Sequence, residues 1–450
     1  MSTTRRTLFS NGSWSLANQI VRVGTLALVT IALSRHFGPQ AFGALAVGLA
    51  LVRIFAVIGT FGLDRVVVRR VAAEEAEADA ILWTAFRLKL LIAFTSYCAL
   101  LALIACVDAQ NTLLLGIVLL AGGGLLFQSC DVFDYFFQAR NRFRLTFIGR
   151  TLPTLFATAL KLSAIILGAP LLVFAALEGI EMALVGAVLF LVYRGCAEPK
   201  PKVGRAKGVD RLPLLGEGLP LLLGTLAAMI YMRSDVLLLG RLVGYRAAGL
   251  YAAAAQITEG CALFPMAFLP ALLPILVEWR RLGEKSYRRQ FENLFLGTFL
   301  VGALVTVCLT TTAPFVIRAL YGTAYTSAAP ILAIHAWSAV FLFFSIIQIG
   351  YEVTNGLAWL TAARTTAGAI LNVALNCLLI PLYGAVGSAI ATVISLACSG
   401  FFFNLLNPAS RPIFRLQLKA LLLIPLLRLI IPGGRDHGRP EMPAGLMIEQ

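Results

Sequence analysis

The sequence predicts an all-α protein that crosses a membrane about twelve times and folds as two similar six-helix lobes around a central cavity. Two features of the composition point to this fold class. Hydrophobic residues make up 59% of the 450 residues and charged residues only 13%, about half the charged fraction of a soluble domain. The apolar residues form long runs, and most basic residues stand in alternate segments between the runs. Polytopic membrane proteins combine these features.

Each predicted span is an apolar run of sufficient length. A helix rises about 1.5 Å per residue, so about 20 apolar residues cross a hydrocarbon core about 30 Å thick. No A-x-A-like cleavage site follows the first run, which predicts a retained helix rather than a signal peptide. Twelve runs meet the length test, with predicted bounds at 14–34, 43–63, 86–107, 113–137, 146–168, 171–193, 213–239, 247–277, 291–317, 331–353, 365–383 and 385–406.

The distribution of Lys and Arg predicts the orientation. If the N-terminus is cytoplasmic, the segments outside the cell hold only Arg35, Arg241, Arg246 and Arg318. We therefore expect both termini in the cytoplasm and the spans in the inner (plasma) membrane. A basic tail, 409–450, is expected to be cytoplasmic. Its short apolar run 416–431 contains Lys419, Pro425 and Arg428, which favours a helix lying in the membrane interface over a thirteenth span.

An internal repeat divides the chain. Segment 196–212 is rich in Pro, Gly and Lys, which predicts a cytoplasmic linker between an N-terminal lobe, 1–195, and a C-terminal lobe, 213–408. Arg35, Gly38 and Gly43 recur 206 positions later as Arg241, Gly244 and Gly249. Each triplet stands in the first outside turn of its half, where glycine permits tight turns and close packing. Both halves begin inside, so the repeat is parallel.

Ionisable residues within the predicted spans need an internal environment, because a charge at the bilayer centre costs about 2.5–3.5 kcal/mol. We expect these side chains to face a wet cavity or one another. Two arginines at similar depth would suit a phosphate group, because guanidinium is planar, permanently charged and bidentate. The alternative for them is a buried ion pair with an acid such as Asp131. The residues predicted to bind substrate in the cavity are Arg22, Arg53, Asn18, Lys161, Arg233, Asn372 and Asn376.

Carboxylates at depth are candidates for coupling transport to protons or sodium: Asp235, Glu259, Glu178 and Asp131.

Polar stripes on the last two predicted spans have a second interpretation as hydrogen bonds between packed helices. One stripe consists of Ser388, Thr392, Ser395 and Ser399. That interpretation is favoured for the stripe of four and is as strong as substrate contact for Asn372 and Asn376.

Motifs for chemistry are missing from the sequence. The three His are far apart, the eight Cys include no CxxC pair, and neither a nucleophile–His–acid set nor a phosphate-binding loop occurs. We therefore expect no enzyme activity, no metal and no cofactor. The basic residues lie in short loops between apolar runs, which argues against nucleic acid as a partner.

Four segments carry a resemblance to a known family: HFGPQAFGALAV from His36 leading to FGLDRVVVRRVA from Phe61, SDVLLLGRLVGYRAAGLYAAA from Ser234, LYGTAYTSAAPIL from Leu320, and NCLLIPLYGAVGSAIAT from Asn376. On these segments the chain resembles the Wzx-type oligosaccharide flippases of the multidrug/oligosaccharidyl-lipid/polysaccharide exporter superfamily. The resemblance implies two six-helix lobes whose cavity opens alternately to each side. It implies an undecaprenyl-pyrophosphate-linked oligosaccharide as cargo, for O-antigen (lipopolysaccharide), capsule or exopolysaccharide.

The resemblance also bears on the site. Related lipid-linked murein-precursor flippases use cavity arginines in helices one and two, and Arg22 and Arg53 match those places by depth. These relatives have a third arginine in helix eight, where this chain has Gln256 and Glu259. The departure puts a three-arginine clamp in doubt, with Arg233 as a candidate replacement.

The predicted function is outward translocation of a lipid-linked oligosaccharide, with membrane lipids, a polysaccharide polymerase and a chain-length regulator as candidate partners. A cation-coupled multidrug exporter of the same superfamily is the alternative, and it would favour a hydrophobic, acid-lined cavity. A membrane polysaccharide polymerase would need a large outside loop with catalytic residues, and the outside loops are short. A non-catalytic scaffold is equally weakly favoured.

Overall fold

The computed structural model describes residues 2–74, 77–196, 211–281 and 283–424, and helices with short turns make up these segments. The N-terminal lobe contains α1 (Ser2–Thr60), α2 (Leu63–Ala73), α3 (Ala78–Val107), α4 (Thr112–Gly122), the 3₁₀ segment η2 (Gly123–Cys130), α5 (Asp131–Ala139), α6 (Phe143–Ile166) and α7 (Leu171–Cys196). The C-terminal lobe contains α8 (Arg211–Leu242), α9 (Tyr245–Arg281), α10 (Glu284–Tyr321), η3 (Thr323–Ala328), α11 (Ala329–His335), α12 (Ser338–Thr354), α13 (Ala358–Ala397), the π segment η4 (Cys398–Phe402), α14 (Phe403–Leu406) and α15 (Arg411–Leu421).

The predicted fold class is confirmed. Within the described ranges, seven helices are long and apolar enough to cross a membrane, and a pair bent by 49° at residues 323–354 makes an eighth. Two of these helices are double, because α1 breaks at Gly38 and α13 breaks at Gly384. Both glycines have positive φ, 73° and 57°, a conformation that other residues rarely adopt. Each break separates two of the runs predicted as spans.

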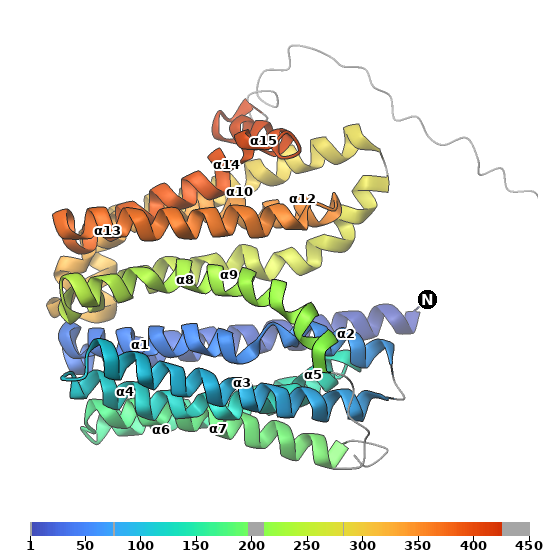
Figure 1. The fold of residues 1–450 in the computed structure, drawn as a ribbon. Helices are drawn as coiled ribbons and strands as arrows, with labels where there is room; N and C mark the ends of the chain where they lie inside the picture. The colour runs from blue at the N-terminus through green and yellow to red at the C-terminus, as the bar shows by residue number, and fades with distance from the viewer. Residues whose placement is uncertain (1, 75–76, 197–210, 282, 425–450) are drawn as a thin grey trace, which may run out of the picture.

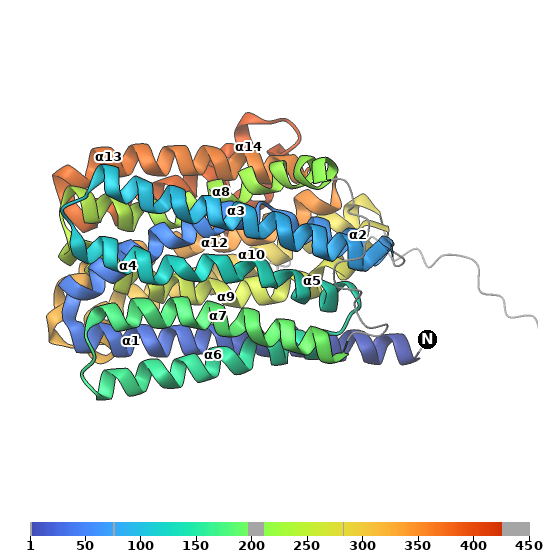
Figure 2. The ribbon, with the colours of Figure 1, turned by 60° about the horizontal axis from the view of Figure 1, so that its bottom comes forward.

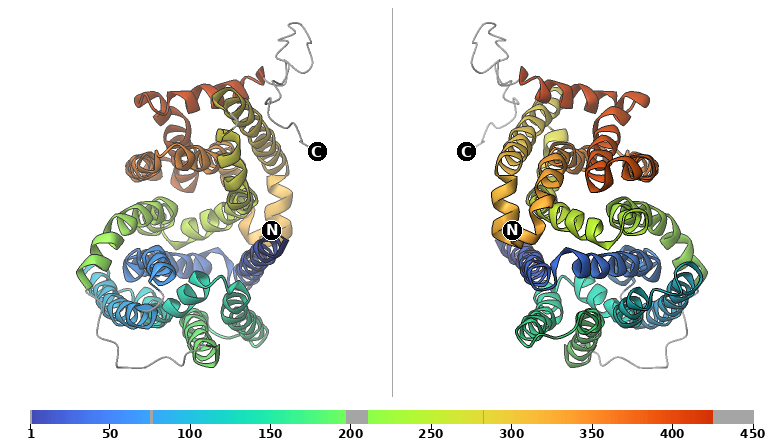
Figure 3. Two further views of the ribbon diagram at one scale, coloured as in Figure 1. Left: turned by 90° about the vertical axis from the view of Figure 1, so that its right-hand side faces the viewer. Right: turned by 90° about the vertical axis from the view of Figure 1, so that its left-hand side faces the viewer.

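The two lobes lie side by side along their length. In Figure 1, α1 to α7 form the lower lobe and α8 to α15 the upper one, with most helices nearly parallel. Figure 2, turned by 60°, shows helices of the two lobes overlapping and running along the same axis, and Figure 3 views the bundle along this axis. We call the end that holds the N-terminus the proximal end, and the end that holds Gly38 and Gly244 the distal end. At the proximal end, parts of α9 and α10 turn away from α1 (Figure 1).

At the distal end the glycines of the internal repeat join the lobes. A Cβ atom on Gly43 would lie 1.8 Å from the carbonyl oxygen of Tyr245, and a Cβ on Gly249 would lie 2.1 Å from that of Pro39. Real Cβ atoms do not approach backbone so closely. The prediction that these glycines permit a turn and close packing is confirmed, because Gly38 and Gly244 have positive φ while Gly43 and Gly249 pack helix on helix.

A second junction between the lobes lies at the proximal end, where α2 packs against α8. Glu217 accepts hydrogen bonds from Arg69 at 2.6 Å and from Arg70 at 2.7 Å. Beside these ion pairs, a Cβ on Gly62 would lie 2.6 Å from the carbonyl oxygen of Gly218. The lobes are therefore held together at the distal end and along one proximal edge.

The start of the predicted tail docks on the C-terminal lobe. Helix α15 buries Ile413 and Leu416 in an apolar cluster with Phe291 of α10. The amide of Gln417, fully buried, donates to the carbonyl oxygen of Gly400 at 3.0 Å. With 11 residues, α15 is too short to span a bilayer. Residues 425–431 of the run predicted at 416–431 lie outside the described residues. Most of the predicted linker, residues 197–210, also lies outside them.

Candidate functional site

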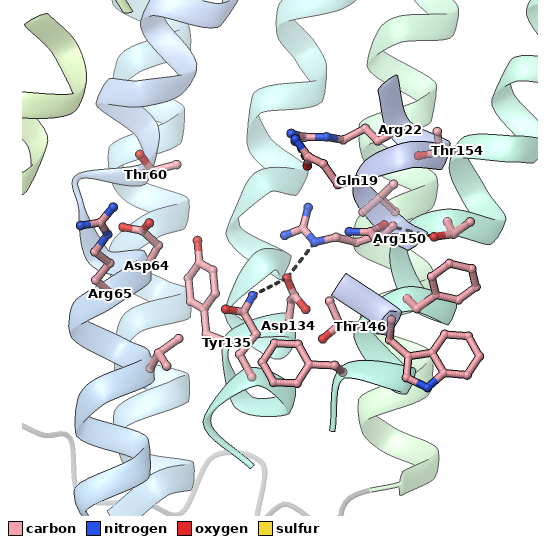
Figure 4. Close-up of a pocket in the computed structure, with 18 of the residues that line it drawn as sticks. Gln19, Arg22, Thr60, Asp64, Arg65, Asp134, Tyr135, Thr146, Arg150 and Thr154 are labelled. Atoms are coloured by element: carbon pink, nitrogen blue, oxygen red, sulfur yellow. Dashed lines mark hydrogen bonds and ion pairs between the residues drawn. The ribbon is translucent and has the colours of Figure 1, made fainter. Parts of the chain in front are cut away.

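A cavity of about 790 Å³ opens in the proximal half of the N-terminal lobe, against α8 of the C-terminal lobe. Figure 4 shows its polar side chains converging from α1, α2, α5 and α6. The residues that line it are Trp14, Asn18, Gln19, Val21, Arg22, Val57, Thr60, Gly62, Asp64, Arg65, Val68, Arg69, Asp134, Tyr135, Gln138, Phe143, Thr146, Phe147, Arg150, Thr151, Thr154, Val185 and Thr225. The cavity is rich in hydroxyls, amides and guanidinium groups.

The lining is cationic. It includes four arginines and two aspartates, a formal net charge of two positive units: Arg22, Arg65, Arg69 and Arg150 against Asp64 and Asp134. Such a balance favours an anionic ligand, because unlike charges in a partly enclosed site are screened less than at an open surface.

Arg22 is the arginine that the cavity leaves most available. Helix α1 places it one turn after Asn18, so both side chains lie on the same face. Its side chain is exposed and donates to Gln19 at 3.1 Å. Among the described residues, no carboxylate lies within 4.0 Å of it, so the ion pair with Asp131 considered for this residue does not form here. Asn18 accepts from the Thr151 hydroxyl at 3.1 Å.

Arg150 lies beside Arg22 on the same side of the cavity but is anchored (Figure 4). It pairs with Asp131 at 2.9 Å and with Asp134 at 2.7 Å, and Asp134 is 1% exposed. The predicted coupling residue Asp131 is thus part of a structural ion triad. Sequence reasoning missed Arg150. The available signal was its spacing of eleven residues, three helical turns, from Lys161 on the same face of α6.

Tyr135 of α5 is a further part of the polar wall of the cavity. Its hydroxyl accepts a hydrogen bond at 2.9 Å from Lys89, a fully buried lysine of α3. The ammonium also lies 4.7 Å from the centre of the Tyr135 ring. Neither residue was predicted, because a single Lys in an apolar helix gives no indication of the helix that will face it.

The other predicted cations do not line the cavity. Arg53 is partly buried and interacts electrostatically with Arg22, Arg233, Glu178 and Glu259. The structure therefore gathers charges of both lobes around Arg53, although this residue does not line the cavity.

Two of the predicted groups are ion-paired. Arg233 of α8 lies 3.4 Å from Glu259 of α9. Lys161 is 4% exposed and bridges Glu178 at 2.6 Å and Glu181 at 2.7 Å, which confirms that these two acids share one face of α7. The cationic charge of Lys161 is already matched inside the N-terminal lobe.

A separate network surrounds Asp235 in the C-terminal lobe. This carboxylate, 4% exposed, accepts from Asn376 at 2.6 Å, from Thr392 at 2.8 Å and from Tyr251. No cation of the described chain lies within 4.0 Å of it, in contrast to Asp131, Glu178 and Glu259. No described group of three His, Cys, Asp or Glu has metal-binding geometry.

The predicted polar stripes meet at this network. Asn372 accepts from Ser234 at 3.0 Å and donates to Ser395 at 3.2 Å, while Gly368 packs closely on Ser399. The asparagines at 372 and 376 are fully buried and lie away from the cavity of the N-terminal lobe. In this conformation both stripes join helix to helix, as interhelical hydrogen bonds in membranes do.

Comparisons with known proteins agree with this architecture. The model of the family described as "Polysaccharide biosynthesis protein" matches residues 8–279. An uncharacterized membrane protein of Methanocaldococcus jannaschii is 25% identical over 224 residues, which cover 48% of this chain and 44% of that relative. The aligned part of the chain thus spans less than half the length of this curated relative.

Solved structures of transporters share the fold. The chain is similar to the lipid II flippase MurJ in an inward closed conformation, with a TM-score of 0.67, 13% identity and 93% and 92% of the two chains covered. It is also similar to an inward-facing multidrug resistance MATE family transporter of the MOP superfamily, with a TM-score of 0.70, 13% identity and coverage of 90% and 95%. At this identity the likeness concerns the fold.

Proposed function

The chain belongs to the polysaccharide biosynthesis protein family, and from this premise we propose that it moves a lipid-linked oligosaccharide outward across the inner membrane. The proposed cargo is an undecaprenyl-pyrophosphate-linked sugar unit destined for O-antigen, capsule or exopolysaccharide. The proximal end, rich in Arg, would face the cytoplasm, as the positive-inside rule favours. The headgroup would enter the cavity of the N-terminal lobe while the lipid tail stays in the bilayer.

The observation that carries this proposal is the charge of the cavity. Four arginines line the cavity. Arg69 and Arg150 are paired with Glu217 and Asp131, but no carboxylate of the described residues lies within 4.0 Å of Arg22, which is therefore available to the negatively charged diphosphate. A multidrug exporter for cations would favour the opposite sign, so the lining argues against that alternative. A polymerase or a scaffold would require no cationic chamber at this depth.

The energy for export has two proposed sources. Moving about two negative charges outward gains roughly 4–5 kcal/mol at about 100 mV, inside negative. Coupling to protons or sodium would add to it. Of the four candidate carboxylates, Asp235 suits this role best, because its partners are neutral hydrogen-bond donors while the other three face cations.

The test is accumulation of lipid-linked oligosaccharide in cells whose gene is replaced by Arg22→Gln or Arg53→Gln. Each variant removes one positive charge and keeps a polar side chain, at the cavity lining for Arg22 and outside it for Arg53. We expect the intermediate to accumulate in the inner leaflet and polymer output to fall by at least tenfold.

Arg281→Gln is the matched control, because Arg281 is 76% exposed in a weak pair with Glu278. Normal polymer output from both arginine variants, at normal protein level, would remove these arginines from the mechanism.

The partners named from the sequence, a polymerase and a chain-length regulator, are proposed to receive the translocated lipid.

A further inference from the structure

We propose that the proximal mouth of the cavity is a sugar-binding subsite, an aromatic platform made by Trp14, Phe143 and Phe147 that holds the first sugar of the cargo. The inference rests on the proposed function and deepens it, because it assigns separate parts of one cavity to the diphosphate and to the glycan.

The platform is built by two helices that both begin at the proximal end. Trp14 comes from the fourth turn of α1, and Phe143 and Phe147 come from the first two turns of α6. The rings of Trp14 and Phe147 lie 5.0 Å apart at 55°, and all three aromatic residues line the cavity while remaining partly exposed. Partly exposed rings inside a polar cavity offer apolar faces to a ligand.

The arginines lie deeper than the rings on both helices. Arg22 follows Trp14 by eight residues on α1, and Arg150 follows Phe143 by seven residues on α6. At about 1.5 Å per residue, the Cα atom of each arginine lies about 10–12 Å further from the proximal end than the Cα atom of the outermost platform residue on its helix. On the wall formed by α1 and α6, aromatic residues therefore lie at the mouth and cations lie further in, while Arg65 and Arg69 line the cavity from α2.

This layering matches the covalent order of a lipid-linked sugar. The lipid tail lies in the hydrocarbon, the diphosphate follows it, and the sugar is attached to the other side of the diphosphate. A ligand whose diphosphate reaches the arginine layer therefore directs its first sugar toward the proximal mouth. Two phosphates and a sugar ring extend over about the distance between the two layers.

Polar groups beside the rings offer hydrogen bonds for sugar hydroxyls. The Thr146 hydroxyl oxygen, on a residue 8% exposed, is buried without a hydrogen-bond partner in the described chain. The carboxylate oxygen Oδ1 of Asp134 is likewise buried and has no hydrogen-bond partner in the described chain. Buried polar atoms are usually satisfied, so these two unpartnered atoms, both on residues of the cavity lining, indicate a hydroxyl-bearing ligand.

The chemistry of the aromatic platform suits a sugar ring. The apolar C–H face of a pyranose packs on aromatic rings, and its hydroxyls bond to the polar groups around them. Trp14, Phe143 and Phe147 supply the rings, and Thr146 between the two phenylalanines supplies a hydroxyl.

The test compares two probes on the purified full-length protein in nanodiscs. One probe is a polyprenyl diphosphate, and the other is the same lipid carrying N-acetylglucosamine on the diphosphate. We expect Trp14→Leu to weaken binding of the glycosylated lipid by roughly tenfold and binding of the bare diphosphate by less than twofold. Arg22→Gln should weaken both probes alike.

Trp359→Leu is the matched control, because Trp359 is 58% exposed on α13 and distant from the cavity. Thr146→Val, which keeps the side-chain shape, should weaken only the glycosylated probe, and it serves as the test if Trp14→Leu fails to fold. Equal losses for both probes, or no loss with either variant, would overturn the sugar subsite. If the wild type binds neither probe, the proposed function itself fails.

Discussion

Gly43 and Gly249, equivalent positions of the two repeats, pack against each other at the distal end. A Cβ atom on Gly43 would lie 2.8 Å from the backbone nitrogen of Gly249, and one on Gly249 would lie 3.0 Å from that of Gly43. The contact is reciprocal, as a two-fold relation between the lobes requires. It closes the distal end, so a cavity that is to open there must first separate these two glycines.

We predict that Gly43→Ala shifts the protein toward a distally open state. The added methyl would lie 1.8 Å from the Tyr245 carbonyl oxygen, so α1 and α9 must move apart by more than an ångström to admit it. Spin labels can be attached at the exposed distal residues Gln110 and Thr326. Double electron–electron resonance should give a longer distance between the two labels in the variant than in the wild type.

The control for this prediction is Gly24→Ala in the same helix, where nothing lies within 4 Å of the added atom. It should leave the distance distribution unchanged. Identical distributions for the wild type and for Gly43→Ala would mean that the distal contact yields locally and is not a gate.

At the proximal junction, close backbone packing should matter more than charge. Glu217 is 33% exposed and Arg69 is 68% exposed, so Glu217→Gln should cost less than about 1 kcal/mol. Gly218→Leu should be far more disruptive, because its Cβ would lie 2.5 Å from the Phe61 carbonyl oxygen. Thermal unfolding followed by size-exclusion chromatography compares the stability of the two variants directly. A larger loss of stability for Glu217→Gln than for Gly218→Leu would reverse this ranking.

The sequence was sufficient for the fold class because bilayer physics acts on each helix separately. Span length, the basic loops and the repeated Gly38 and Gly244 are local signals, and both glycines have the positive φ expected of turns. The break at Gly384 was also predicted, because it falls between the last two predicted spans, 365–383 and 385–406.

The partners of charged residues could not be predicted in the same way. Spacing shows which residues share a helix face, so the common face of Glu178 and Glu181 could be predicted. Their shared partner Lys161 could not, because it depends on how α6 packs on α7. Likewise, Asp131 was considered as an alternative partner of Arg22 or Arg53 but bonds to Arg150. Which faces meet is a tertiary property, and a single sequence records it weakly.

We predict that Arg150→Leu destabilises the N-terminal lobe by about 3–5 kcal/mol, because Asp134 is then left buried without its cation. The double variant Arg150→Leu/Asp134→Leu should recover much of this loss, since no buried charge remains unpaired at Asp134. Thermal unfolding in detergent measures both variants, with Arg281→Gln as the exposed control. Additive losses in the double variant would contradict the coupling of the pair.

Asp235 provides the last prediction, which concerns energy coupling. Asp235→Asn keeps the shape of the side chain and removes the carboxylate that Asn376, Thr392 and Tyr251 contact. If a proton or sodium ion binds there, export in proteoliposomes should lose its stimulation by an ion gradient while substrate binding stays within about twofold. The cavity is in the other lobe, so binding and coupling are separable.

The control for this last prediction is Tyr251→Phe, which removes one hydrogen-bond donor but retains the carboxylate charge. It should preserve gradient stimulation, although the ion concentration needed for half of the effect can change. If Asp235→Asn is stimulated as strongly as the wild type, the network is a structural joint between α8 and α13, and the membrane potential acting on the cargo becomes the remaining source of energy.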